Sequence, residues 1–300
     1  MLKPNTDEVR VVEPGTKLTH RIEDLFRYRE LISNLVRKEL RVKYKNSVLG
    51  FVWSLLNPAL LLAIYWLVFT KFLGQAIPHF PIFLLSGLLG FNLLSMGLSS
   101  SVTSLIGNAS LVTKVYFPRE SLPISAIGAS LMHFFFQLIV LAVALVILRT
   151  GVSAAALILV PAALLVQLVL LFGVCLFAAV LNVYFRDVQH LVEIGLLAWF
   201  WMTPIVYPVG FLQQNLGHLW VLSFLNPMTA ITLAYQRGIY IKTQYVQVVN
   251  GVRHVNILIP HEPILWYLRN LGLVGIGALV LAWLGWSVFR RLESRLAEEL

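Results

Sequence analysis

The chain contains 300 residues, of which 58% are hydrophobic and only 12% are charged. Soluble domains carry roughly 25% charged residues, so this composition excludes an ordinary soluble protein. The net charge of +9 does not indicate nucleic-acid binding, because the basic residues gather beside long apolar runs instead of on one folded face. We expect no nucleic-acid partner and interpret the basic residues as orientation signals and contacts for anionic membrane lipid.

Six long stretches of the sequence contain no Asp, Glu, Lys or Arg, and each can hold a helix that crosses a bilayer, which takes about 20 residues. They are continuous runs of apolar residues without the alternation of barrel strands, so they predict helices. The predicted fold class is an all-α polytopic membrane protein with six transmembrane helices. The predicted spans are 51–71, 81–105, 124–148, 154–182, 191–208 and 264–288.

The distribution of Lys and Arg predicts how these spans are oriented. Most basic residues lie in 1–50, 106–123, 183–190 and 289–300, which alternate with the outer segments as cytoplasmic segments do. Both termini are therefore expected in the cytoplasm. The predicted divisions are a flexible tail at 1–18, an interfacial helix at 19–46, a transmembrane domain at 47–289 and a C-terminal tail at 290–300.

The segment 19–46 precedes the first predicted span and is unlike a secretory signal peptide. Its apolar residues recur at helical spacing with basic residues between them, which is typical of an amphipathic helix in the inner headgroup layer. The alternative is a solvated helix packed on a soluble partner. Its basic residues near the first span are Arg37, Lys38, Arg41, Lys43 and Lys45.

The cytoplasmic loop 107–123 combines charged and aromatic residues beside a proline. Aromatic side chains flanked by charges at a rigid turn suit docking into a groove on another protein, and we expect both aromatic side chains to be exposed. The alternative is an ordinary loop that carries orientation charges. Its candidate docking residues are Lys114, Tyr116, Phe117, Pro118, Arg119 and Glu120.

Polar and aromatic side chains inside the spans are candidates for lining a passage. In the third span Ser125, His133 and Gln137 recur at helical spacing and give one face of the helix a polar stripe. Such stripes line passages or bind neighbouring helices, and both interpretations stay open. Aromatic residues near span ends, Trp53 and Tyr65 among them, are membrane anchors or platforms for sugar rings.

Residues that could carry out catalysis are scarce. The G-x-x-x-x-G-K-[ST] phosphate-binding sequence is absent, so an ATPase of that class is excluded. His190 and Glu193 are three residues apart near the fifth span, and we favour a hydrogen-bonded pair over a metal site because no third ligand is near. We therefore predict no catalytic residue, no metal and no cofactor on this chain. A membrane-embedded glycosyltransferase or phosphatase is the less favoured alternative.

The region 209–260, between the fifth and sixth spans, is apolar but interrupted by Pro and Gly. Broken backbone at membrane depth must line a cavity or be buried in protein. We therefore expect re-entrant half-helices on the outer side of the membrane.

Four stretches, taken in order, resemble the permeases of ABC-2 type polysaccharide exporters, which include the transporters for O-antigen, teichoic acid, galactan and related lipid-linked glycans. One departure is Gly90-Phe91 in the second span, where relatives often have Pro-Trp. The four stretches are Arg41-Val-Lys-Tyr-Lys-Asn-Ser-Val-Leu-Gly-Phe-Val-Trp-Ser-Leu-Leu-Asn-Pro58, Lys114-Val-Tyr-Phe-Pro-Arg-Glu120, Asn182-Val-Tyr-Phe-Arg-Asp187 with Thr203-Pro-Ile-Val-Tyr207, and Asn226-Pro227.

The resemblance implies a homodimer in the bacterial inner membrane, bound to two copies of a separate ATPase that holds ATP and Mg. It implies that 107–123 is the ATPase-coupling loop, that the N-terminal helix borders a lateral opening and that 209–260 lines the outer exit. The implied cargo is an undecaprenyl-diphosphate-linked glycan, and a different lipid or small molecule is the alternative. Cationic side chains at the inner headgroup level suit the diphosphate, since they pair with phosphate oxygens.

Overall fold

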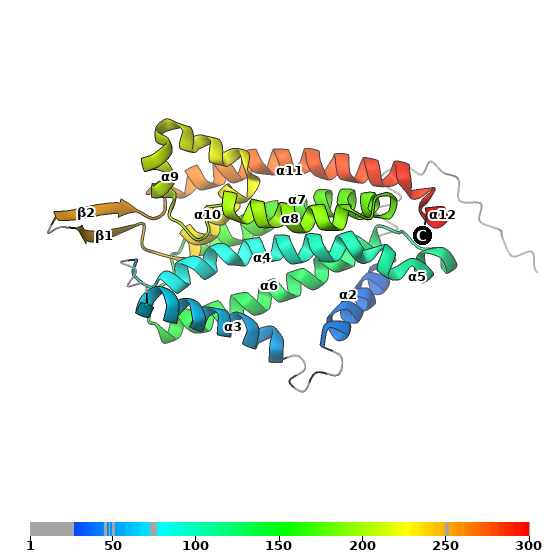
Figure 1. Ribbon diagram of the computed structural model, residues 1–300, viewed down its shortest axis with the longest axis horizontal. Helices are drawn as coiled ribbons and strands as arrows, with labels where there is room; N and C mark the ends of the chain where they lie inside the picture. The colour runs from blue at the N-terminus through cyan, green and yellow to red at the C-terminus, as the bar shows by residue number, and fades with distance from the viewer. Residues whose placement is uncertain are drawn as a thin grey trace, which may run out of the picture.

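The computed structural model describes residues 27–44, 47, 49, 52–72, 77–249 and 252–299. Four of its helices are long and apolar enough to cross a membrane: α4 (Phe80–Ser104), α6 (Ser121–Ile147), α7 (Ala156–Tyr184) and α11 (Ile264–Glu293). They run along the length of an elongated bundle (Figure 1). The chain is a multi-pass membrane protein built of helices, which confirms the all-α, polytopic part of the prediction.

Two shorter apolar helices occupy the first and fifth predicted spans. Helix α3 (Trp53–Tyr65) continues as the π-helical segment η2 (Trp66–Phe72), and α8 covers Val188–Met202. Helix α8 ends where Thr203 adopts an extended backbone before Pro204, as the residue before a proline prefers. Counting these two helices gives the predicted six spans, and that count stays a prediction.

The region after α8 folds back on the bundle through a sharp bend. Helix α9 (Val209–Leu216) and the 3-10 segment η4 (Gly217–Leu225) meet α10 (Pro227–Ile239) at 103°, which fits a broken span or a re-entrant loop. Asn226 caps α10 by accepting a hydrogen bond from the Met228 amide at 3.0 Å. Pro227 follows as the first helical residue, a position where its missing N–H costs nothing.

A two-stranded antiparallel hairpin was not expected from the sequence. Strands β1 (Gln244–Val249) and β2 (Val252–Ile257) pair with Val249 opposite Val252. The hairpin projects beyond the helices at one end of the bundle (Figure 1), which we call the hairpin end.

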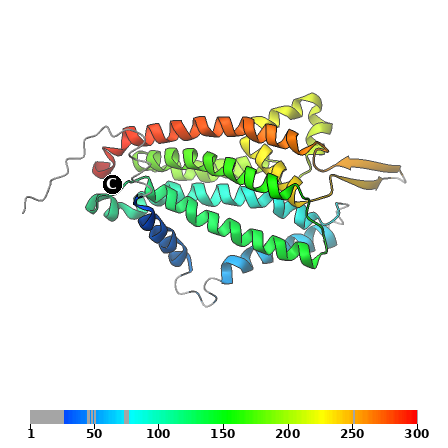
Figure 2. The same ribbon diagram turned by 180° about the vertical axis from the view of Figure 1, so that it is seen from behind.

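The opposite end, where the C-terminus lies, carries most of the remaining short helices (Figure 2). These are the N-terminal part of α2 (Arg29–Tyr44), the 3-10 turn η3 (Ile106–Asn108), α5 (Ala109–Lys114) and α12 (Leu296–Glu299). We call this the α5 end. Helix α2 packs on α6, where Gly128 leaves room for the Val36 side chain.

Helix α4 lies in the centre of the bundle and is buried on nearly all sides. Buried polar side chains bind it to its neighbours: the Gln167 amide donates to the Gly90 carbonyl at 2.5 Å, and Tyr235 donates to Gln167 at 3.0 Å. A Cβ at Gly90 would lie 2.7 Å from the Tyr235 ring, so glycine is required there. Phe91, the second residue of the departure from relatives, contacts the Phe200 ring edge-on at 5.3 Å.

Candidate functional site

A cavity of about 260 Å³ lies between the start of α3, α4 and α6. It brings together three of the five residues that the sequence indicated as lining a passage, namely Trp53, His133 and Gln137. The other lining residues were missed, although Asn57 stands one helical turn after Trp53 and that spacing places both on one face. The lining residues are Ser47, Trp53, Ser54, Asn57, Pro58, Met96, His133 and Gln137.

The chemistry of this cavity is polar but uncharged, because none of these described lining residues is Asp, Glu, Lys or Arg. The Gln137 amide oxygen accepts from Asn92 of α4 at 3.1 Å. This bond leaves the amide nitrogen of Gln137 as a donor. His133 is 7% exposed and contacts Phe136 edge-on at 6.0 Å. The Trp53 indole is 42% exposed, so it offers an aromatic face beside neutral hydrogen-bonding groups.

A second cavity of about 160 Å³ adjoins the first, since Met96 and His133 line both. It lies between α2, α4 and α6, and its lining is richer in small and apolar side chains. The two cavities together follow α6 from α2 to the start of α3. The lining residues of the second are Glu39, Leu40, Val42, Met96, Ser100, Ala126, Ala129, Ser130 and His133.

The two remaining candidate lining residues lie away from both cavities. Ser125 is 3% exposed, and its hydroxyl donates to the Leu122 carbonyl at 2.7 Å within α6. Tyr65 packs on the main apolar core, with its ring 6.3 Å from that of Phe69. The structure therefore separates Ser125 and Tyr65 from the other three residues.

The basic residues of α2 point in different directions. Arg37 and Arg41 are exposed and stand four residues apart, which places them on one helix face. Lys38 instead donates to the Asn108 side chain at 2.5 Å and so ties α2 to η3. The Lys43 side chain and all of Lys45 lie outside the described residues.

The predicted docking loop forms η3, the short helix α5 and an extended turn before α6. Lys114 and Tyr116 are open to solvent, and Tyr116 is 74% exposed. The expectation that Phe117 is exposed was wrong, because its side chain is only 5% exposed. It is buried in an apolar cluster that includes Phe289 of α11. The turn therefore directs one aromatic side chain outward and the other inward.

The other three candidate docking residues pack against their own chain. Glu120 is 2% exposed, and Pro118 and Arg119 are partly buried. The Arg119 guanidinium donates to the backbone carbonyl of Glu293, in the last turn of α11. Of the six candidate docking residues, Lys114 and Tyr116 are thus the two whose side chains are exposed.

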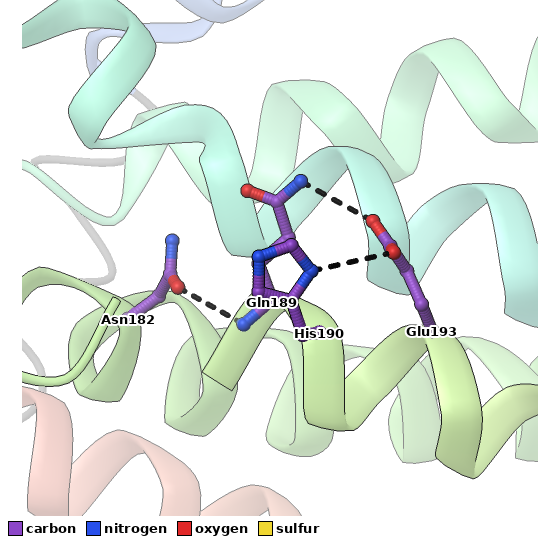
Figure 3. Close-up of polar contacts among 4 residues, drawn as sticks. All are labelled: Asn182, Gln189, His190 and Glu193. Atoms are coloured by element: carbon purple, nitrogen blue, oxygen red, sulfur yellow. Dashed lines mark hydrogen bonds and ion pairs between the residues drawn. The ribbon is translucent and has the colours of Figure 1, made fainter. Parts of the chain in front are cut away.

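Asn182 ties three helices together at the α5 end (Figure 3). Its amide nitrogen donates to the Val102 carbonyl of α4 at 2.9 Å, and its oxygen accepts from the Gln189 backbone amide of α8 at 3.1 Å. His190 and Glu193 lie close together one turn further on, but the 3.7 Å between Nδ1 and Oε2 is longer than a hydrogen bond. The Glu193 carboxylate accepts instead from the Gln189 side chain at 3.2 Å. Across the described residues no three His, Cys, Asp or Glu side chains gather as metal ligands would.

Two further stretches of the resemblance meet each other near the hairpin end. The Asn226 amide donates to the Thr203 hydroxyl at 2.9 Å, and the Asn226 oxygen accepts from the Trp199 indole at 2.7 Å. Thr203 in turn donates to the Trp199 carbonyl at 2.8 Å. This closed set of bonds fixes the bend between α8 and α10.

Several long apolar helices and a sharply bent helix pair define a multi-pass membrane protein. Residues 30–240 match the family described as "ABC-2 type transporter". The chain belongs to the ABC-2 type transporter family, and the resemblance predicted from the four stretches is confirmed.

Individual relatives agree with this assignment. The chain is 35% identical over 224 residues to the O-antigen export system permease protein RfbA of Myxococcus xanthus, covering 73% of this chain and 84% of the relative. It is 28% identical over 271 residues to a protein of the same name from Klebsiella pneumoniae, covering 90% of this chain and 95% of the relative. These similarities span nearly the whole bundle.

Proposed function

We propose that this chain is the permease subunit of an ATP-driven exporter that moves an undecaprenyl-diphosphate-linked polysaccharide from the cytoplasmic to the outer leaflet of the bacterial inner membrane. The observation that carries the proposal is the similarity to proteins named as O-antigen export permeases, which extends over 73% of the chain in one case and 90% in another. The chain itself is not an enzyme in this account, because the work is done by ATP on a partner.

The cavity beside Trp53 supports a sugar as cargo. Sugar rings are neutral, carry many hydroxyl groups and have apolar faces. Uncharged donors and acceptors such as those of Asn57 and Gln137 suit the hydroxyl groups, and an exposed indole suits the ring face. The adjoining cavity is lined partly by Leu40, Val42 and Met96, and we assign this apolar part of its wall to the lipid portion of the cargo.

The exposed face of α2 supports loading of an anionic lipid. Arg37 and Arg41 present guanidinium groups that bind phosphate oxygens through two parallel hydrogen bonds. We assign them to the diphosphate, together with Lys43 and Lys45. Lys38 has a different role in this account, since it binds Asn108.

Coupling to ATP is assigned to the exposed part of the α5 end. Val115 and Tyr116 are 54% and 74% exposed beside Lys114, which is an apolar and aromatic surface with a positive rim. It suits a groove on the ATPase, where ATP and Mg bind. Two copies of each subunit form the working complex, and ATP binding shifts the permease between conformations through its different affinity for each.

The topology of the proposal has six spans with both termini in the cytoplasm, so the α5 end lies inside and the hairpin end outside. The bent pair of α9–η4 and α10 then stands at the outer exit. Part-buried hydrogen bonds of Asn226 support the bend and give the broken backbone polar partners, as its place at membrane depth requires.

Depletion of this chain in its native bacterium tests the proposal. We expect undecaprenyl-linked polymer to accumulate inside the cell while surface glycan falls, and the sugar composition of the accumulated polymer identifies the cargo. An unchanged surface without internal accumulation would contradict the glycan and favour another lipid or small molecule. Loss of polymer synthesis itself would favour a glycosyltransferase or phosphatase.

A further inference from the structure

Two side chains from distant parts of the sequence bind the C-terminal end of α11. Tyr184, the last residue of α7, donates its hydroxyl to the Leu292 carbonyl at 2.8 Å. Arg119, which precedes α6, donates to the carbonyl of the next residue, Glu293. The last turn of a helix carries its negative dipole end, and the Leu292 carbonyl also accepts from the Arg295 backbone amide at 3.2 Å. A guanidinium therefore binds there through a charge-assisted hydrogen bond.

The helix that Arg119 binds is itself joined closely to α7. A Cβ at Gly173 of α7 would lie 2.5 Å from the backbone of Leu281 and Ala282, and a Cβ at Gly285 of α11 would overlap the Gly173 carbonyl oxygen. The two helices thus meet backbone to backbone, as small residues allow in membranes. Because protein interiors are close-packed and not continuously deformable, α7 and α11 behave as one rigid pair.

Apolar side chains also join the loop to the C-terminal end of α11. Phe117 from the loop, Phe289 from α11 and Leu296 from α12 are buried in one cluster, with exposures of 5%, 0% and 0%. The Arg119 bond beside this cluster is partly buried, and a charged hydrogen bond is stronger where it is partly shielded from water.

We propose that Arg119 and Tyr184 form a clasp that makes the loop segment 109–120 move together with the α7–α11 pair. Tyr184 fixes the end of α11 on α7, and Arg119 fastens the loop to that end. Arg119 is then a positioning residue inside this chain and not a contact for the ATPase. This inference rests on the proposed function, because a partner ATPase is what would push the loop.

The test measures the distance between α5 and the C-terminal end of α11. Ser110 of α5 and Ser294 after α11 are exposed, and replacing both with Cys allows spin labelling because the one native cysteine, Cys175, is buried. The labelled permease is assembled with its ATPase and compared without nucleotide and with trapped ATP. We expect the same narrow distance distribution in both states.

The variants are Arg119→Gln with Tyr184→Phe, and the matched control is Arg291→Gln, which removes an exposed cation from the same end of α11. We expect the paired variant to give a distribution that broadens or shifts with ATP, whereas the control behaves like the parent. A parent distance that changes with ATP, or a paired variant that matches the parent, would overturn the clasp.

Measuring glycan export by the same complexes distinguishes a failure of this inference from a failure of the proposed function. With the clasp broken, export per ATP hydrolysed should fall by about tenfold, which is the order expected for losing a charge-assisted hydrogen bond. If the parent complex hydrolyses ATP but exports no glycan, the proposed cargo is wrong, while the distance measurement still decides the clasp.

Discussion

The α5 end and the start of α3 are built in opposite ways. At the α5 end, Lys38, Arg119, Asn182 and Tyr184 each bind a distant segment through a hydrogen bond. Helix α3 buries only Ser54 and Pro58, and its other side chains are half-buried or exposed, with Trp53 42% and Leu60 45% exposed. Fastened segments transmit movement, while a loosely packed helix can move aside at low cost. In the proposed mechanism, force therefore enters at the α5 end and the cavity widens on the α3 side.

The largest expected effect concerns the close contact between α7 and α11. Gly285→Ala should separate α7 from α11, because its methyl group has no space beside the Gly173 carbonyl. We expect destabilisation of about 3 kcal/mol or more, at the upper end for overpacked cores. Gly277→Ala in the same helix is the control, since a Cβ there meets nothing within 4 Å. The measurement is thermal unfolding of the purified protein. Equal melting temperatures for the two variants would disprove the backbone contact.

Asn182→Ala should have the next largest effect. It removes the side-chain partner of the buried Val102 carbonyl and of the partly buried Gln189 amide, at a cost of about 1–3 kcal/mol for the buried carbonyl. Gln189→Ala is the control, because its side chain is bound only to Glu193 on the exposed surface. Thermal unfolding and membrane abundance are measured together. A variant as stable as the parent would show that Asn182 does not hold the α5 end together.

On the loosely packed side, Trp53→Ala should change transport more than stability. Its indole is 42% exposed, so folding loses little, but the proposed sugar loses its aromatic platform. We expect export to fall by about tenfold, equivalent to roughly 1.4 kcal/mol. Leu60→Ala removes a similarly exposed side chain from the same helix, outside the residues that line the cavity. Equal export by the two variants would show that the cavity does not lie on the transport pathway.

The smallest expected effect is electrostatic. Charge reversal of Arg37 or of Arg41 to Glu, one at a time, should weaken loading of an anionic lipid by about 1 kcal/mol, and the parent's advantage should shrink as salt is raised. Arg29→Glu at the start of the same exposed helix is the control. Binding of undecaprenyl diphosphate to the purified protein is measured at two salt concentrations. Binding that is unchanged by the reversal would contradict the loading role of α2.

The sequence predicted the long helices well because apolar runs without charges have few alternatives in a membrane protein. It also predicted α2 from its helical periodicity and the family from four short stretches. The hairpin was missed although Asn250-Gly251 stands between its two strands, and Asn-Gly is the strongest short signal for such a turn.

Other features could not be predicted from local patterns. Phe117 is buried because Phe289, far away in the sequence, covers it, and its neighbours along the chain do not indicate this. Arg119 binds a backbone carbonyl. Because every residue has a backbone carbonyl, the sequence does not indicate which one a side chain will bind. Ser125 and His133 share a polar stripe, yet only His133 reaches the cavity, because the position of α3 decides which part of α6 is covered.

Reconstitution tests the central claim most directly. The chain and its partner ATPase are purified, placed in liposomes that contain undecaprenyl-diphosphate-linked glycan, and supplied with ATP and Mg on the side of the α5 end. The account predicts that glycan appears in the opposite leaflet only when ATP is hydrolysed. Robust ATP hydrolysis without any change in the leaflet that holds the glycan would contradict it.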